Sequence, residues 1–167
     1  MNAEFVVLRL LHIVAGAFWV GSALFLTLIL EPSVRALGPA IQGPVMRKLG
    51  PKVGMAAGTA SFITVGAGVA LALRLRWNSL DTWFDTGWGY AILIGFIVSI
   101  LGIVTGAMTG AQSMKMERIA KGITGRAPTP EETQQMKQLS ERLAKFGRAT
   151  AVLVTIGVGT MAAARFV

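Results

Sequence analysis

The feature that most constrains the fold is an apolar run near the start of the chain, from Phe5 to Leu30. A helix needs roughly 20 such residues to cross the hydrocarbon core of a bilayer. The only ionisable residues in the run are Arg9 and His12, and His12 is the only histidine of the chain. The run is too long for the apolar region of a signal peptide, and no small-x-small cleavage motif follows it. We therefore expect a membrane-spanning helix that stays in the mature protein.

Three further apolar runs predict three further spans, so that the four spans cover about residues 3–30, 53–73, 89–111 and 149–164. Apolar residues make up 53% of the chain and charged residues 14%, which is typical of an integral membrane protein. Little polar sequence remains for a separate soluble domain. The sequence predicts one membrane domain over 1–167, an all-α, four-helix transmembrane bundle of up-down topology in a lipid bilayer.

The first two connections carry different signals. Glu31-Pro32 is expected to end the first helix, since proline cannot continue one without losing a hydrogen bond. Gly38-Pro39, Gly43-Pro44 and Gly50-Pro51 are expected to be turns within a connection over 31–52. The connection over 74–88 contains three tryptophans, which favour the membrane–water interface.

The third connection contains a helix of its own. Thr129, Pro130 and Glu132 have the spacing of a capping box, which predicts a helix start. Apolar residues then recur at helical spacing: Met136, Leu139, Leu143 and Phe146. We expect a cytoplasmic amphipathic helix that runs on into the fourth span.

The basic residues predict the orientation in the membrane. The formal net charge is +8, and twelve of the sixteen basic side chains fall in the first and third connections or directly beside them. The other four are Arg9, Arg74, Arg76 and Arg165. The positive-inside rule then places both termini on the non-cytoplasmic side of the cell inner (plasma) membrane. No basic stripe interleaved with aromatic residues is present, so nucleic acid is not an expected partner.

Glycines recur at spacings of four in two of the spans. Gly102, Gly106 and Gly110 form one ridge, and Gly54 and Gly58 form a shorter one. Small residues at this spacing let helix backbones approach closely. The ridges predict packing within the bundle, in a homodimer or against another subunit of a membrane complex. The lesser reading is that they clear room for a flat cofactor.

A candidate site surrounds His12. Arg9, His12, Gly16 and Trp19 share one face of the first helix at positions i, i+3, i+7 and i+10. An ionisable residue within a span is a functional candidate by default. Four readings are open: a core hydrogen bond, haem ligation, a copper site and a proton relay.

Haem b fits the neighbours of His12 best. Imidazole is a common axial ligand of haem iron, and Gly16 removes a side chain that would block a porphyrin. Arg9, Arg74, Arg76 and Arg165 are expected at the membrane face where propionates would project, although snorkelling at helix ends explains each arginine alone. The second axial ligand would be Met161, at a similar depth, or the His12 of a second copy. Methionine in a span is otherwise core filler.

Copper is the rival cofactor. Imidazole and thioether groups suit Cu(I), and Met108, Met114 and Met116 lie near the inner end of the third span. Few ligands lie between them and His12. The chain has no cysteine, which excludes thiolate metal sites and covalently attached haem. No acidic residue lies within a span, so a carboxylate relay of a pump or ion-coupled transporter is not expected.

The stretch "LLHIVAGAFWVGSALFLTLILEPSVRALGP" resembles the opening of small four-helix integral membrane proteins grouped with the CopD-like (copper-resistance D) domains. Residues 8–21 are also similar to the first helix of HemJ-type protoporphyrinogen oxidases, whose histidine is associated with haem b. The closing "GVGTMAAARFV" resembles the end of uncharacterised members. The resemblance implies a four-helix membrane fold and a cofactor-ligand role for His12.

The expected function is that of a haem b-binding integral membrane protein in electron transfer or haem handling. The alternative is a membrane scaffold or accessory subunit of a larger complex, without catalysis, and the third is a copper-handling membrane protein. No set of nucleophile, base and orienting residue points to an enzyme activity.

Overall fold

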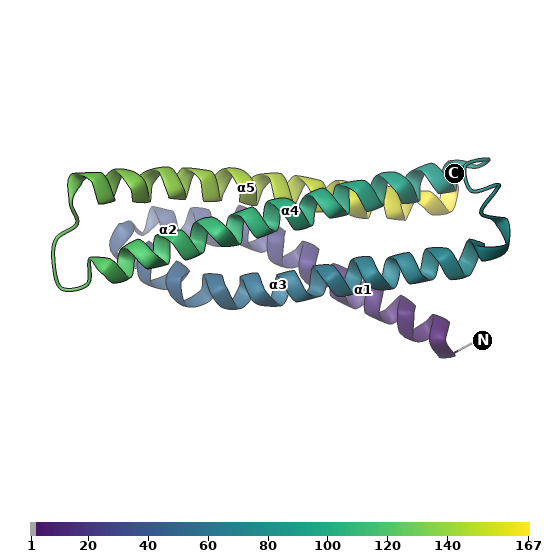
Figure 1. Cartoon of the computed structure of the whole chain (residues 1–167), viewed down its shortest axis with the longest axis horizontal. Helices are drawn as coiled ribbons and strands as arrows, with labels where there is room; N and C mark the ends of the chain where they lie inside the picture. Colours follow the sequence, from purple (N-terminus) through teal and green to yellow (C-terminus); the bar gives the residue numbers. More distant parts are fainter. Residues whose placement is uncertain (1–2) are drawn as a thin grey trace.

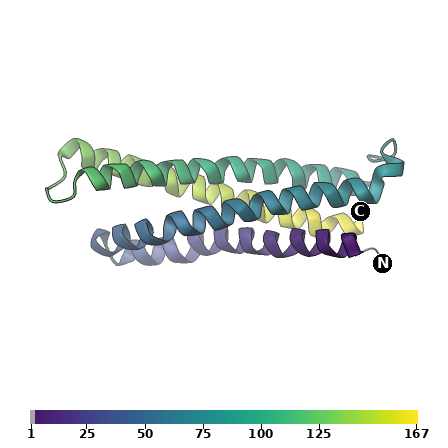
Figure 2. The same ribbon diagram turned by 60° about the horizontal axis from the view of Figure 1, so that its bottom comes forward.

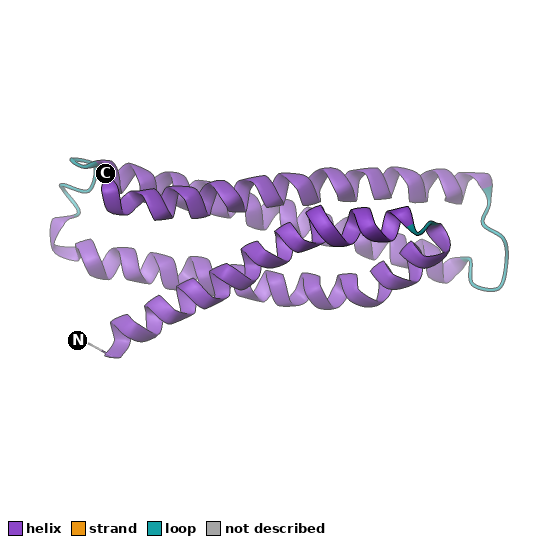
Figure 3. Cartoon of the chain, turned by 180° about the vertical axis from the view of Figure 1, so that it is seen from behind, coloured by secondary structure: helices purple, strands orange, loops and turns teal. Residues whose placement is uncertain are grey.

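The structure is a computed structural model that describes residues 3–167. Its elements are α1 (Ala3–Leu24), a π-helical segment (Phe25–Leu30), α2 (Glu31–Ala36), α3 (Pro39–Arg76), a 3-10 turn (Trp77–Ser79), α4 (Gly87–Gly122), α5 (Pro130–Ala163) and a second 3-10 turn (Ala164–Phe166). These described residues contain helices and no strand (Figure 3). Four helical stretches are long and apolar enough to cross a membrane. The predicted all-α, four-helix transmembrane bundle is confirmed.

The four long helices run up and down along one axis (Figure 1). The closest packing is between α4 and α5 and between α1 and α3, with fewer contacts between the two pairs. Both ends of the described chain lie at one end of the bundle with the connection over 77–86. At the other end the α4–α5 hairpin extends beyond the turn between α2 and α3 (Figures 1 and 2). The helical extension before the fourth span is therefore present.

The expectation that Pro32 ends the first helix is wrong. The chain passes from α1 through the π-helical segment Phe25–Leu30 directly into α2, where Pro32 lies in the first turn. Within that segment the Glu31 N–H donates to the Leu26 carbonyl, a hydrogen bond one residue longer than in an α-helix. A π-helical turn shifts the hydrogen-bond register next to a proline, which lacks an N–H and crowds the preceding turn. The helix therefore continues past Pro32.

Only one of the three expected glycine–proline turns is present. Gly38 has φ 85°, a conformation that favours glycine, and Pro39 starts α3. Pro44 and Pro51 instead lie inside α3, a helix of 38 residues. At Gly50 an added Cβ would lie 3.6 Å from the Ser113 hydroxyl of α4. Near Pro51 the helix thus packs against α4, and packing of this kind favours a continuous helix over the local turn signal.

The glycine ridge of α4 meets other helices over part of its length. An added Cβ at Gly102 would lie 3.2 Å from Val154 Cγ1 and 3.4 Å from the Trp19 ring, and one at Gly106 would lie 3.9 Å from Thr150 Cγ2. At Gly110 nothing lies within 4 Å. Gly54 and Gly58 of α3 also have open space at the Cβ position. The ridge therefore packs closely within the bundle at Gly102 and more loosely at Gly106, whereas Gly110 and the two glycines of α3 meet no other helix at the Cβ position.

Leucine at position 102 is expected to destabilise the bundle. The Gly102→Leu side chain would overlap Val154 and Trp19, and overpacking of this kind costs roughly 1–3 kcal/mol. Gly110→Leu is the matched control, since its side chain would enter open space. Thermal unfolding in detergent measures the difference. Equal melting temperatures for the two variants would mean that the centre of the ridge is not closely packed.

The predicted start of α5 is confirmed. The Glu132 N–H donates to Thr129 Oγ1 at 3.2 Å, and the Thr129 N–H donates to Glu132 Oε2 at 2.9 Å, which completes the capping box. Arg126 Nη1 also donates to Glu132 Oε2 at 2.8 Å. The predicted apolar positions Met136, Leu139, Leu143 and Phe146 are all partly buried. This side of α5 therefore faces the hairpin rather than solvent.

Candidate functional site around His12

His12 lies where α1 crosses α3. Its Nδ1 atom is 2.8 Å from the Thr64 carbonyl oxygen. The ring rests on Gly68, where an added Cβ would lie only 2.7 Å from Cε1 and 2.8 Å from Nδ1. A glycine is needed at position 68, because any side chain there would overlap the imidazole.

The hydrogen bond sets the tautomer of the neutral imidazole. A carbonyl oxygen only accepts, so Nδ1 carries the proton and donates it to Thr64. Nε2 then keeps a lone pair, and it is the ring nitrogen farther from α3, 3.8 Å from the Cβ position of Gly68. A ring N–H held by a backbone carbonyl is the arrangement that orients histidine ligands of metals. The hydrogen bond to Thr64 thus fixes the orientation of the His12 ring within the span.

Two other predicted site residues serve helix packing. An added Cβ at Gly16 would lie 3.3 Å from Thr64 Cγ2, so the space beside this glycine is occupied by a side chain of α3. Trp19 is 6% exposed and belongs to a small core with Ala60 and Val154. The face shared by His12, Gly16 and Trp19 is therefore directed into the bundle.

The four arginines that we expected near propionates lie toward the end of the bundle that bears the termini, but three have partners in the chain. Arg74 Nη2 is 2.7 Å from Glu4 Oε1. The Arg76 guanidinium lies 5.0 Å from the centre of the Trp88 ring, and that of Arg165 lies 5.9 Å from the centre of the Phe166 ring. Arg9 is exposed and makes no ion pair with any residue in 3–167. Of the four, only Arg74 is neutralised by a carboxylate of the described chain, and Arg9 makes neither an ion pair nor a ring contact there.

Met161 lies in the same layer of the bundle as His12. Arg76 beside Trp88 and Gly50 beside Ser113 fix the antiparallel register of α3 and α4, which places Gly68 opposite Gly95. His12 packs against Gly68, and the Met161 methyl group would lie 2.6 Å from a Cβ at Gly95. His12 and Met161, the two predicted axial ligands, thus each pack against a glycine of a neighbouring helix.

The predicted copper methionines lie elsewhere. Met108 is thirteen residues along α4 from Gly95, or about 20 Å at the rise of an α-helix. Met108 and Met114 are exposed, and Met116 is partly buried further along the same helix. Residues 3–167 contain no group of three or more histidine, cysteine or carboxylate side chains that could hold a metal ion. A metal at His12 would therefore depend on thioether or porphyrin ligands.

Sequence reasoning missed the two partners of His12 and an apolar groove beside it. Thr64 and Gly68 carry no recognisable ligand motif, although two small residues four apart in a span are a signal of close helix approach. The groove lies between α1 and α3 and has a volume of about 860 Å³. Its lining residues are Leu10, Leu11, Val14, Ala15 and Phe18 of α1 and Lys52, Met55, Ala56, Thr59, Ala60 and Ile63 of α3.

Among known proteins, no family model, no curated protein and no solved structure matches this chain.

Proposed function

We propose that this chain is an integral membrane protein that binds haem b through His12 and acts in electron transfer or haem handling. The observation that carries the proposal is the hydrogen bond of 2.8 Å from His12 Nδ1 to the Thr64 carbonyl. It orients the imidazole and leaves Nε2 with a free lone pair that can bind a metal. Fixing a ligand in this way reduces the entropy that metal binding would otherwise cost.

The surroundings of His12 agree with its expected role as an iron ligand, but they do not agree with the expected place of the porphyrin against Gly16. Gly68 lets the imidazole lie against α3, and Met161 supplies a thioether in the same layer. Gly16, by contrast, is covered by Thr64, so a porphyrin would lie on the Nε2 side of the ring and not against Gly16. Arg9 remains available for a propionate. Haem bound here would supply a one-electron redox centre.

The apolar groove between α1 and α3 favours the scaffold function as a second candidate. Its walls are almost entirely apolar, and Leu10, Val14, Phe18 and Met55 are all exposed in the single chain. An exposed apolar groove on a membrane helix pair can accept a helix of another subunit. If the protein is a scaffold, the hydrogen bond between His12 and Thr64 serves only to hold α1 against α3.

One preparation separates the candidates. The protein is expressed with ample haem and copper, purified, and measured by visible absorption and by elemental analysis. A Soret band with sharp reduced α and β bands supports haem. Bound copper without a Soret band would support the copper-handling function instead. A colourless, metal-free protein would support the scaffold function.

We also propose the orientation that the basic residues predict, with both termini on the non-cytoplasmic side of the plasma membrane. Asn78→Cys, in the connection that shares an end with the termini, should react from outside with a thiol reagent that cannot cross the membrane. Gln134→Cys, at the other end, should react only after lysis. Both positions are exposed. Labelling of position 134 but not 78 in intact cells would reverse the proposed topology.

A further inference from the structure

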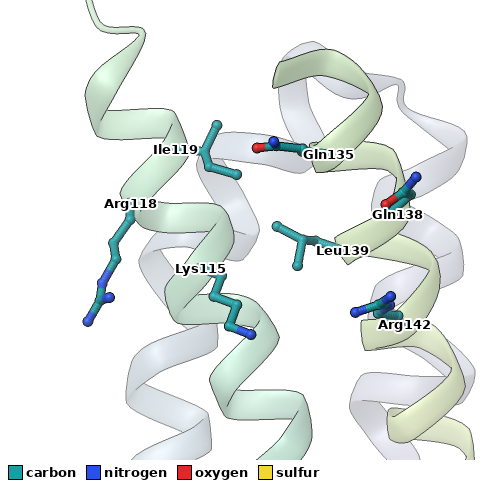
Figure 4. Close-up of a pocket in the computed structure, with 7 residues that line it drawn as sticks. All are labelled: Lys115, Arg118, Ile119, Gln135, Gln138, Leu139 and Arg142. Carbon is teal, nitrogen blue, oxygen red and sulfur yellow. The ribbon is translucent and has the colours of Figure 1, made fainter. Parts of the chain in front are cut away.

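A pocket unrelated to His12 lies between α4 and α5, toward the end of the bundle opposite the termini (Figure 4). Its volume is about 350 Å³. The lining residues are Lys115, Arg118 and Ile119 of α4 and Gln135, Gln138, Leu139 and Arg142 of α5. The lining residues thus include three cations, two amides and two apolar side chains.

The positive charge of this pocket is not neutralised within the chain. No acidic residue lines it, and none of its three cations forms an ion pair with a residue in 3–167. The nearby carboxylate of Glu117 is held by Lys121 at 2.8 Å. In Figure 4 the Lys115 and Arg142 side chains extend into the space between the helices, and Arg118 points away. Lys115 and Arg142 are therefore placed to meet an anion from two sides.

The pocket lies at the depth expected for lipid headgroups. Lys115 is the first charged residue of α4 after its apolar stretch. The contacts of Gly102 with Val154 and Gly106 with Thr150 fix the register of the hairpin, which brings Arg142 to the level of Lys115. Closer to the bilayer centre, exposed apolar side chains continue along both helices, among them Val104 and Met108 of α4 and Val152 and Ile156 of α5. The charged pocket thus borders an exposed apolar surface of the same two helices on the side nearer the bilayer centre.

We propose that this pocket binds the headgroup phosphate of an anionic phospholipid. Arg142 offers a guanidinium that can hold two phosphate oxygens, and Lys115 adds a second positive charge. Gln135, whose amide extends toward α4 in Figure 4, offers an amide donor. On the side of these charges nearer the bilayer centre, the exposed side chains of Met108 and Val104 are placed to contact the glycerol and upper acyl carbons. Ile119 and Leu139 lie on the other side, toward the hairpin turn. Basic pockets between membrane helices are established sites for such headgroups. The place of the pocket where the apolar stretch of α4 ends, at headgroup depth, favours a lipid headgroup over a soluble phosphate.

The test compares the wild-type protein with two double variants in nanodiscs of phosphatidylcholine. Binding of a fluorescent phosphatidylglycerol is measured for each. Lys115→Gln/Arg142→Gln removes both pocket charges, and Lys137→Gln/Arg148→Gln removes the same charge from the hairpin outside the pocket. Each basic residue near a membrane surface contributes about a fivefold gain in affinity for anionic lipid. Both variants lose this diffuse attraction, but only the pocket variant also loses direct contacts with the phosphate, so we expect it to bind at least about tenfold more weakly than the control variant.

Three results would overturn this assignment. Equal weakening in both variants would mean that only diffuse charge attracts the lipid. Equal binding of phosphatidylglycerol and phosphatidylcholine would mean that the headgroup charge is not recognised. Displacement of the lipid by millimolar inorganic phosphate would identify a soluble anion as the occupant. Matching circular dichroism and melting temperatures of the variants in phosphatidylcholine serve as the folding control.

Discussion

Replacement of His12 by alanine is expected to abolish stoichiometric haem binding while the protein still inserts into the membrane. The imidazole is the only histidine side chain of the chain, so no other residue of this type can take over as ligand. Insertion is expected to survive because the apolar run of α1 is unchanged. The measurement is the haem-to-protein ratio of the purified variant beside that of wild type.

Loss of folding would be a different explanation for loss of haem, and the structure separates the two. His12→Ala removes one hydrogen bond to the Thr64 carbonyl, which keeps its place in the hydrogen-bond ladder of α3. The expected cost is about 1 kcal/mol. A variant that retains wild-type haem content would contradict the ligand role of His12. A variant with normal membrane content and a slightly lower melting temperature but no haem would support it.

Alanine in place of Gly68 is expected to displace the His12 ring without removing it. The added methyl group would lie within 2.8 Å of two ring atoms, closer than nonbonded atoms approach, so the ring must move away from α3. The hydrogen bond to Thr64 would be lost, and Nε2 would change direction. We expect a several-fold weaker retention of haem and an altered spectrum of the fraction that remains.

Gly66→Ala is the matched control for this change. Nothing lies within 4 Å of its Cβ position, so the methyl group enters open space. Alanine is favoured over glycine within a helix by up to about 1 kcal/mol, so this variant should be at least as stable as wild type. Identical spectra and haem contents for the two alanine variants would show that Gly68 does not position His12.

Much of the fold follows from local sequence signals. The apolar runs predict the four spans because three of them reach the length that a bilayer requires, and the shorter fourth run continues the amphipathic helix that precedes it. The start of α5 is equally local, since Thr129 and Glu132 satisfy each other's backbone groups three residues apart. Pro32, Pro44 and Pro51 were misread for the opposite reason. Their effect depends on a π-helical turn and on packing between helices, which a short window of sequence does not contain.

Only the part of the candidate site that lies on α1 was predicted from the sequence. His12 was identified because a titratable group is costly within a span. Its partner Thr64 lies 52 residues away, and that contact depends on how α1 crosses α3. The same crossing explains why Gly16, expected to clear room for a porphyrin, instead receives the Thr64 side chain. Sequence spacing gives the face of a helix but not what lies against it.

The most direct test of the central claim is chemical rescue of His12→Gly with free imidazole. Removal of the side chain leaves a space into which imidazole can diffuse and ligate iron through the same kind of nitrogen. We predict that the variant loses haem and that added imidazole restores haem binding and the wild-type reduced spectrum. Haem that stays bound with an unchanged spectrum in the variant without imidazole would contradict the assignment of His12 as the ligand.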